Sequence, residues 1–293
     1  MNCKKKEFVT KEGVTTVFKI TFIKLLLHNQ VHCVITKQRT MKKNKLLYGI
    51  RQIFLGIAFI IGLVLLFNKP ITNYLIENYH PVIFGDEVRT EKKTKAPYDW
   101  ASVKPLNLFA VAKARAYHPQ IKVVGGIYNQ KLGLNVPIVN GVDQTIYSLC
   151  AGTLEPNEKM GQSNYSIAAH NVSSSKDALF APIYQKAKVG DTLNITNFHK
   201  VYTYKIYAKA PVSQHNNTIL EDSSQPNLTL VTCGNANQNS KQRFVYQAKL
   251  TKTSNYNDVP ASTKAFLNEK YTLKSSRWNM IYLHMLETGK HQK

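Results

Sequence analysis

The feature that most constrains this chain is an uncharged apolar run near its N-terminus. The run covers residues 53–67 and reads IFLGIAFIIGLVLLF. It is shorter than the ~20 residues that a membrane-spanning helix usually needs, but residues 46–50 are also apolar and Arg51 can snorkel to the membrane surface. The sequence therefore predicts one transmembrane helix over residues 46–67.

Charge asymmetry around this run predicts its orientation. Lys42, Lys43, Lys45 and Arg51 lie at its start, whereas only Lys69 lies close behind it. By the positive-inside rule the N-terminus is cytoplasmic and the chain after residue 68 is extracellular. No small-residue cleavage site follows the run, which favours a retained signal-anchor in a single-pass protein of the cell membrane.

The segment before the membrane run is a basic cytoplasmic leader over residues 1–45. Its first 40 residues match no typical element, whereas Met41 opens a typical signal-anchor, so we expect translation to start at Met41. The net charge of +22 is partly concentrated in this leader. The rest of the chain has no block of Lys and Arg, no zinc pattern and no RNA-binding signature, so no nucleic-acid partner is expected.

The chain contains four cysteines, Cys3, Cys33, Cys150 and Cys233, with no CxxC pair. Only two of them follow the membrane run, which is too few for a disulfide framework. We therefore expect Cys233 to be free for chemistry, and Cys150, which follows an apolar segment, to be a small buried core residue.

The region after the membrane run divides into a stalk, a domain and a tail. Residues 68–104 contain prolines and a charged run at 91–95, which indicates an extracellular stalk with little to bury. Residues 106–117 predict a short amphipathic helix. Its expected apolar face consists of Leu106, Phe109, Ala110 and Ala114.

From residue 122 onward the sequence pattern is typical of β-strands. Short β-rich runs occur at residues 123–128, 132–139, 193–196, 201–207 and 243–250. In the last run Phe244, Tyr246, Ala248 and Leu250 alternate with polar residues and are expected to point inward. Many short strands and few helices predict an all-β barrel or sandwich over residues 105–255, followed by a tail over 256–293 with a small helix at 261–271.

One of these strands ends at a thiol. Residues 228–233 read LTLVTC and are followed by the loop-forming residues 234–237, so Cys233 is presented at the edge of a sheet, with Thr229 and Val231 on its side of the strand. A free cysteine has a pKa of ~8.5 and a histidine one of ~6.5, so a thiolate–imidazolium pair forms only on the order of one per cent of the time without help. A cation, best an arginine, would stabilise both the thiolate and a developing oxyanion.

Two residues qualify as partners for Cys233. His170 ends the strand-like run of residues 165–170, in which Tyr165, Ile167 and Ala169 are expected to point inward. Arg243 opens the strand after Cys233, and between Tyr117 and residue 255 the sequence has no other arginine. His118, His199 and His215 remain rival histidines.

Taken together, these segments resemble the sortase family. YSIAAH at residues 165–170 is similar to its catalytic histidine strand, TLVTC at 229–233 to its cysteine signature, and RFVYQA at 243–248 to its arginine strand. The resemblance covers about residues 98–250 and is greatest to class A. It departs in minor ways, since Ala169 stands where Gly or Ser is usual and Cys150 where Gly is common.

The resemblance implies an eight-stranded sortase barrel with short helices and a cysteine transpeptidase activity. Cys233 would attack the Thr–Gly carbonyl of an LPXTG-type sorting signal, His170 would move protons, and Arg243 would hold the substrate backbone and oxyanion. Thr232, Ala169 and Val231 would belong to the substrate-binding residues.

The implied partners are secreted surface proteins that bear the sorting signal, and a lipid-linked peptidoglycan precursor that supplies the acceptor amine. No cofactor is expected. The acidic residues Glu155, Glu158, Asp177, Glu221 and Asp222 are too sparse to form an oxygen cage, so no metal site is expected either.

Several alternatives share these features. A thiol protease would use the same acyl-enzyme and release it to water. A pilus-polymerising sortase would carry the same residues with a lid and a second membrane span. A catalytically inactive, membrane-tethered β-barrel would be a binding module, and in that case Cys233→Ala would leave surface-protein display intact.

Overall fold

The computed structural model describes residues 45–85, 96–116, 121–234 and 242–274. The chain divides into two compact units, Met1–Leu66 and Phe67–Lys293. The leader before residue 45, the expected start at Met41, the charged run at 91–95 and the rival His118 lie outside the described residues.

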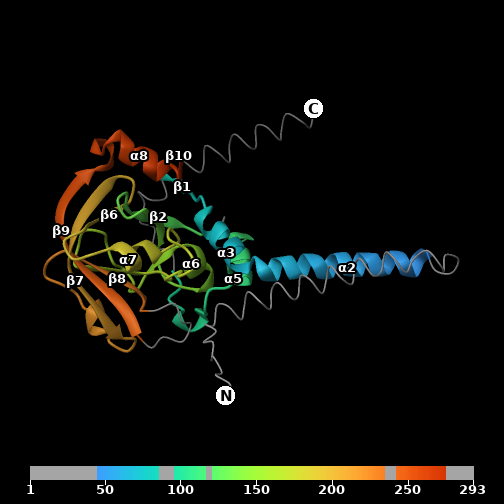
Figure 1. The fold of residues 1–293 in the computed structure, drawn as a ribbon. Helices are drawn as coiled ribbons and strands as arrows, with labels where there is room; N and C mark the ends of the chain where they lie inside the picture. Colours follow the sequence, from blue (N-terminus) through green and yellow to red (C-terminus); the bar gives the residue numbers. More distant parts are fainter. Residues whose placement is uncertain (1–44, 86–95, 117–120, 235–241, 275–293) are drawn as a thin grey trace, which may run out of the picture. The chain divides into compact units, whose positions relative to one another are not determined.

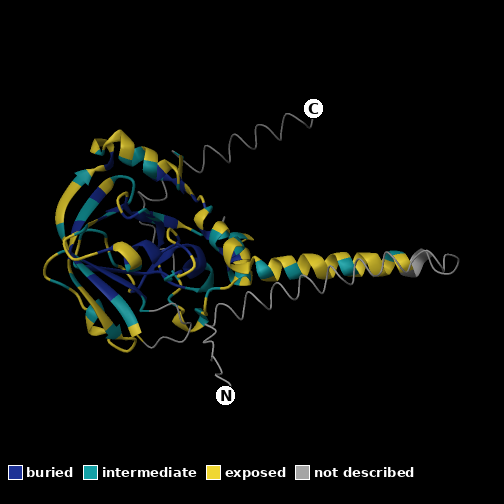
Figure 2. Cartoon of the chain, in the orientation of Figure 1, coloured by how far each residue is buried: buried dark blue, intermediate teal, exposed yellow. Residues whose placement is uncertain are grey.

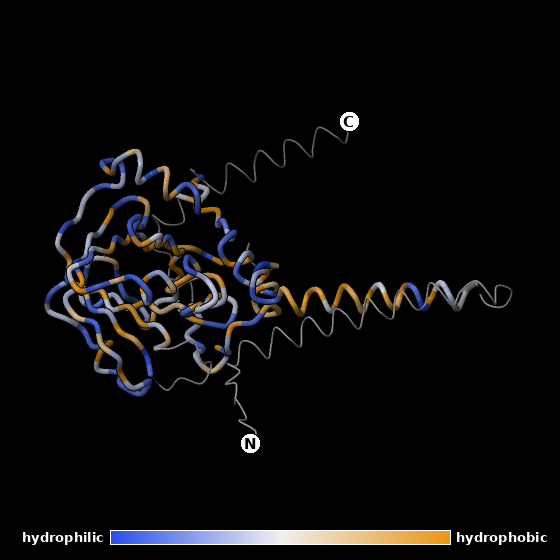
Figure 3. The backbone as a smooth tube through the Cα atoms, viewed as in Figure 1, coloured by the Kyte–Doolittle hydropathy of each residue, from blue (hydrophilic) through white to orange (hydrophobic). Residues whose placement is uncertain are grey.

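In the first unit the structure describes helix α2, Lys45–Leu66. Its 22 residues span about 33 Å at 1.5 Å per residue, close to the ~30 Å of a bilayer core. Figure 3 shows that most of this helix is apolar, with a hydrophilic stretch toward its N-terminal end. Among the described residues, Tyr48–Leu66 is the one stretch long and apolar enough to cross a membrane, which makes it a candidate span.

The second unit is built from short helices and β-strands (Figure 1). Its helices, including single 3₁₀ turns marked η, are α3 (Asn68–Glu77), η2 (Trp100–Ser102), α5 (Leu108–Ala116), α6 (Gln144–Leu149), α7 (Ala181–Lys186), η4 (Thr218–Leu220), η5 (Tyr256–Asp258) and α8 (Ala261–Asn268). Its strands are β1 (Val82–Phe84), β2 (Val123–Asn129), β3 (Leu134–Val139), β4 (Ala151–Thr153), β5 (Asn164–Ala168), β6 (Thr192–Thr196), β7 (Lys200–Ser213), β8 (Asn227–Cys233), β9 (Gln242–Asn255) and β10 (Thr272–Lys274).

Eight of these strands close into a barrel in the order β2-β3-β4-β5-β8-β9-β7-β6. The antiparallel pair of β2 with β6 closes it, and β3–β4 and β5–β8 are parallel pairs. The long strands β7 and β9 pair antiparallel along their whole length. The predicted eight-stranded barrel with short helices is confirmed.

The barrel interior holds the main hydrophobic core, which Figure 2 shows as a buried centre. Tyr165 and Ile167 of β5 and Tyr246 and Ala248 of β9 are buried in it, as their alternation predicted. The alternate residues on these strands point to the outer face, where some are covered by a second, smaller apolar cluster. The barrel wall at β5, β8 and β9 is therefore packed on both sides.

The prediction that residues 68–104 have little to bury is wrong. Ile76 on α3, Tyr79 after it and Ile83 on β1 are all buried in the main core. β1 pairs in parallel with β10, with Val82 opposite Thr272, so this segment is held by a strand from the end of the chain. Its apolar residues meet a partner that is distant along the chain, which the sequence of the segment alone does not indicate.

Two other helices can be compared with the helices predicted from the sequence. α5 forms where a helix was predicted. Of its predicted apolar face, Ala114 is buried and Leu106 packs against the main core, but Phe109 is 78% exposed and Val111 is buried instead, so the face is correct only in part. α5 packs against α3 and α6, and these neighbours determine which of its faces is covered. The predicted helix near residue 261 is confirmed by α8, whose Leu267 is buried in the main core.

Candidate active site

Three neighbouring strands of the barrel bring the predicted catalytic residues into one row. β5 and β8 are parallel with Ala168 opposite Val231, so His170 and Cys233, each two residues further on, leave the strands at the same level. β8 and β9 are antiparallel and place Cys233 opposite Arg243. Cys233 therefore lies between His170 and Arg243.

Hydrogen bonds fasten the histidine segment to the end of β8. The Ala169 amide donates to the Val231 carbonyl at 3.3 Å, and the Thr232 hydroxyl donates to the Ala169 carbonyl at 2.9 Å. The Asn171 side-chain amide donates to the Cys233 carbonyl at 3.2 Å. Because both neighbours of His170 in sequence are bonded to residues 231–233, the imidazole is held beside the cysteine although it lies beyond the regular strand.

Burial and the arginine together set the protonation of the pair. Burial, followed by the positive charge of Arg243, lowers the pKa of His170 to about 4, and Nε2 of this ring is enclosed with no hydrogen-bond partner among the described residues. Burial raises the pKa of the half-buried Cys233 thiol, and Arg243 partly offsets that rise. Near neutral pH the resting pair is therefore an uncharged thiol and an uncharged imidazole.

Tyr147 is a site residue that the sequence did not point to. It lies on α6, whose N-terminus is capped by the Asp143 carboxylate, and its ring centroid is 4.3 Å from that of His170. Burial and the nearby Cys233 thiol raise the pKa of Tyr147, so its hydroxyl stays protonated. Its segment was read only as apolar core, because no strand pattern predicts that α6 lies over the end of β5.

The chain is similar to known proteins of one family. Residues 127–251 match the family described as "Sortase domain". Sortase A of Streptococcus agalactiae serotype III (strain NEM316) is 32% identical over 245 residues, which cover 79% of this chain and 98% of that protein. The chain belongs to the sortase family.

Other relatives and solved structures carry the same family name. Sortase A of Listeria monocytogenes serovar 1/2a (strain ATCC BAA-679 / EGD-e) is 27% identical over 202 residues, covering 67% of this chain and 90% of that protein. A crystal structure of Listeria monocytogenes sortase A overlaps 50% of this chain and 97% of its own, with 24% identity and a TM-score of 0.45.

Family membership makes this chain a cysteine transpeptidase, as the three motifs predicted. Sortases act on surface proteins that carry sorting signals. Of the two free cysteines that the structure describes, Cys150 is fully buried, as expected, whereas Cys233 is partly exposed at the end of β8. Cys233 is thus the accessible thiol of this sortase within the described part of the chain.

The three residues predicted to bind substrate are mostly enclosed. Ala169 and Thr232 are 0% and 1% exposed, and Thr232 uses its hydroxyl to bond the histidine segment. Val231 is 8% exposed and points to the outer face, on the same side of β8 as Cys233. Of the three side chains, Val231 alone belongs to the apolar cluster on the outer face of the barrel.

An apolar patch adjoins the row of catalytic candidates on the outer face of the sortase barrel. Buried residues form its floor, and partly buried ones from the segment after η2, the end of β7 and η4 pack against them. We name this set the outer apolar cluster; its members are Val142, Tyr147, Leu154, Ala168, Val231 and Val245, with Val103, Val212, Ile219 and Leu220 packed against them.

Acidic side chains do not gather into a metal site among the described residues, where no group of three or more His, Cys, Asp or Glu side chains has the arrangement to hold an ion. Glu158 is an acidic residue whose surroundings make it a poor metal ligand. It accepts hydrogen bonds from the Ser166 amide and hydroxyl, and burial raises the pKa of its carboxyl to about 8. A carboxyl that stays protonated near neutral pH is a poor ligand for a hard cation.

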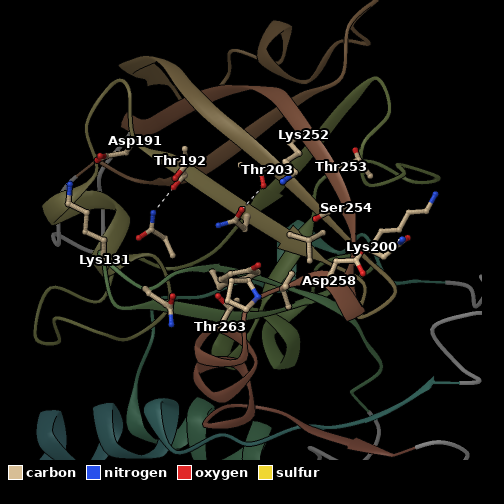
Figure 4. Close-up of a pocket in the computed structure, with 18 of the residues that line it drawn as sticks. Lys131, Asp191, Thr192, Lys200, Thr203, Lys252, Thr253, Ser254, Asp258 and Thr263 are labelled. Atoms are coloured by element: carbon tan, nitrogen blue, oxygen red, sulfur yellow. Dashed lines mark hydrogen bonds between the residues drawn. The ribbon is translucent and has the colours of Figure 1, made fainter.

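A polar cavity of about 1050 Å³ lies away from this row (Figure 4). Its lining includes Lys200 and Asn255, which pair at one end of β7 and β9, whereas Val212 and Arg243 pair near the other end. Along the strand these positions are roughly 40 Å apart. The cavity is lined mainly by hydroxyl, amide and lysine side chains, and none of the predicted site residues is among them.

Proposed function

We propose that this sortase cleaves an LPXTG-type sorting signal between Thr and Gly and joins the released acyl group to the amine of a lipid-linked peptidoglycan precursor. The observation that carries the proposal is the row of His170, Cys233 and Arg243 beside the outer apolar cluster. Such a cluster offers an apolar floor for the leucine and proline of the signal, and the row offers a nucleophile, a proton carrier and a fixed cation.

The first half-reaction begins with proton transfer from the Cys233 thiol to His170. The thiolate attacks the threonine carbonyl carbon, and the negative charge that develops on the oxygen is stabilised by Arg243. The C–N bond breaks as the imidazolium gives its proton to the leaving glycine amine, which leaves a thioester on Cys233 and a neutral imidazole.

The second half-reaction reverses these roles with a new amine. The acceptor amine attacks the thioester carbon while His170 takes its proton, and the C–S bond breaks to form a new amide. The imidazolium then returns the proton to the Cys233 sulfur, which restores the starting pair. Water in place of the amine would give hydrolysis.

The roles of the surrounding residues follow from their contacts. We assign Val231 to the floor under the sorting signal, and Thr232 and Ala169 to positioning, because their mutual hydrogen bond fastens the histidine segment to β8. We further propose that the catalytic domain extends beyond residues 105–255 to include α3, β1 and α8, whose apolar residues share the main core, and β10, which pairs with β1.

The location belongs to the same proposal. Helix α2 would cross the cell membrane once, with the basic leader in the cytoplasm and the catalytic domain outside. That placement supports the function, because secreted surface proteins and lipid-linked precursors meet at the outer surface.

A peptide assay tests the proposal. The full chain in detergent is incubated with a fluorogenic LPXTG peptide and triglycine, and wild type is compared with Cys233→Ala, His170→Ala and Arg243→Ala. Each variant should lose at least about 100-fold in turnover, since each removes a group acting in the transition state. Intact mass should reveal an acyl-enzyme in the wild type and none in Cys233→Ala.

Cys150→Ala is the matched control, because Cys150 is also a free cysteine but is buried in the main core. It should retain the acyl-enzyme and the turnover. Turnover that survives Cys233→Ala would exclude the proposed mechanism, and cleavage without any joined triglycine product would favour a thiol protease.

A further inference from the structure

An exposed indole lies next to the candidate active site. Trp100 on η2 is 44% exposed, and its ring centroid is 6.0 Å from that of Tyr147 in an edge-to-face arrangement. Tyr147 is in turn 4.3 Å from His170. The three rings thus form a continuous aromatic series from the surface to the predicted proton carrier.

The segment that carries Trp100 is firmly held. The Asp99 amide donates to the Val142 carbonyl at 2.9 Å, and the Val142 amide donates to the Pro97 carbonyl at 2.7 Å. On the other side of η2, the Lys104 amide donates to the Gln144 side-chain oxygen at 2.5 Å. Trp100 therefore stays beside α6, in a position fixed before any substrate arrives.

The strand order indicates which substrate lies near the rings of Trp100 and Tyr147. Across the end of the barrel the order is β4, β5, β8, β9 and β7, so Arg243 lies on one side of Cys233 and His170 on the other. α6 leads directly into β4, which places Tyr147 and Trp100 on the His170 side. His170 meets the leaving amine and then the incoming one, because the second half-reaction retraces the path of the first.

The local chemistry suits an amine. Carboxylates cap both short helices here: Asp99 accepts from the Ser102 amide at η2, and Asp143 accepts from the Ile146 amide at α6. A primary amine is mostly protonated near pH 7 and is attracted to the face of an aromatic ring, with tryptophan the strongest. The helices that carry the two rings are thus each capped by a carboxylate, which favours a cationic ligand although the protein as a whole is strongly basic.

We propose that Trp100, together with Tyr147, binds the amine-bearing acceptor of the second half-reaction and so governs transfer against hydrolysis. The inference rests on the proposed function and names the residue that its second substrate contacts. Trp100 lies outside residues 127–251, the part that matches the family description, so it is a specificity residue supplied by the preceding segment.

The test separates the two half-reactions in the full chain in detergent. Acylation is followed with an LPXTG peptide that ends at a glycine amide, so that the leaving group is a single residue. Transfer is followed with triglycine as the acceptor probe. Trp100→Ala should raise the KM for triglycine roughly two- to fivefold. The acylation rate should be unchanged, and the fraction of acyl-enzyme that is hydrolysed should rise as the fraction transferred to triglycine falls.

Three comparisons keep the result interpretable. Trp100→Leu retains apolar volume without the ring and should behave as Trp100→Ala does. Hydroxylamine, a small neutral nucleophile, should keep its wild-type KM in both variants. Phe109→Ala removes another exposed aromatic ring, on the exposed face of α5, and should change none of these values.

An unchanged KM for triglycine in Trp100→Ala would overturn the inference, as would wild-type behaviour of Trp100→Leu. Loss of acylation in a folded Trp100→Ala protein would instead assign the indole to the sorting signal and also overturn it. Failure of the wild type to form any acyl-enzyme would count against the proposed function itself, which this assay detects separately.

Discussion

Cys233 experiences two opposing effects on its pKa. Burial disfavours the thiolate and raises the pKa, whereas the guanidinium of Arg243, on the residue opposite in the sheet, favours the thiolate. The same guanidinium disfavours the imidazolium of His170. A single arginine therefore shifts the two members of the pair downward together, and its removal must raise both values.

This balance predicts a pH dependence for alkylation of Cys233. In the wild type the iodoacetamide rate should rise with a midpoint above the ordinary cysteine value of ~8.5. Arg243→Met, which removes the charge but keeps much of the side-chain length, should move the midpoint higher, and Arg243→Lys should stay near wild type. Mass spectrometry of the modified peptide distinguishes Cys233 from the other cysteines.

The histidine supplies an independent check on the same prediction. Its pKa of about 4 in the wild type should rise toward the ordinary ~6.5 in Arg243→Met when followed by NMR. A cysteine midpoint that falls when the charge is removed would show that Arg243 does not act on the thiol through its charge.

Residues whose role follows from one strand and its neighbour were predictable from the sequence. The alternation of residues 165–170 and 243–248, together with the end of the run at Cys233, indicated which side chains face outward. Tyr147 and Asn171 were not predictable, because their roles depend on where α6 lies and on a side-chain bond to the Cys233 carbonyl. Neither contact produces a periodic residue pattern that could be recognised in the sequence.

At the scale of elements, the pairing of β1 with β10 is the main departure from the sequence prediction. β1 is three residues long and lies between Pro81 and Gly85, so it gives only a weak strand signal of its own. Its Ile83 is nevertheless 2% exposed in the main core, and its register places it opposite Leu273. The strand exists because a partner distant in sequence completes it.

A substitution pair on β1 measures this contribution. Ile83→Ala should lower the free energy of unfolding by about 2–5 kcal/mol, since it removes a buried aliphatic side chain and leaves a cavity. Val82→Ala, on the same strand but 44% exposed, should change it by less than about 0.5 kcal/mol. Urea unfolding of residues 67–293 followed by circular dichroism gives both values.

Equal effects of the two substitutions would contradict the burial of β1. Elements with a strong period of their own, such as β8 and β9, could be predicted from the sequence, and so could the short helix α8. The stalk interpretation failed because prolines and the charged run at 91–95 indicated a linker, whereas the apolar side chains of residues 68–85 include Ile76, Tyr79 and Ile83, which all pack into one core.

At the scale of the whole molecule, the proposed orientation predicts which residues are reachable from outside the cell. In a chain whose native cysteines are replaced by alanine, Ser262→Cys on the exposed start of α8 should react with a membrane-impermeant maleimide on intact cells. Asn44→Cys, on the other side of helix α2 in sequence, should react only after the cells are opened. The opposite pattern would mean that the positive-inside rule misassigns this chain.

Helix α3 begins at Asn68, two residues after α2 ends at Leu66, and it buries Ile76 in the same core that β5 and β8 enclose. Mechanical tension on the N-terminal segment therefore reaches α3 and then β1 before it reaches any strand of the barrel. With α2 in the membrane as proposed, a load on this tether is first taken up by elements that carry none of the catalytic candidates. His170, Cys233 and Arg243 therefore lie on strands that the chain reaches only after α3 and β1.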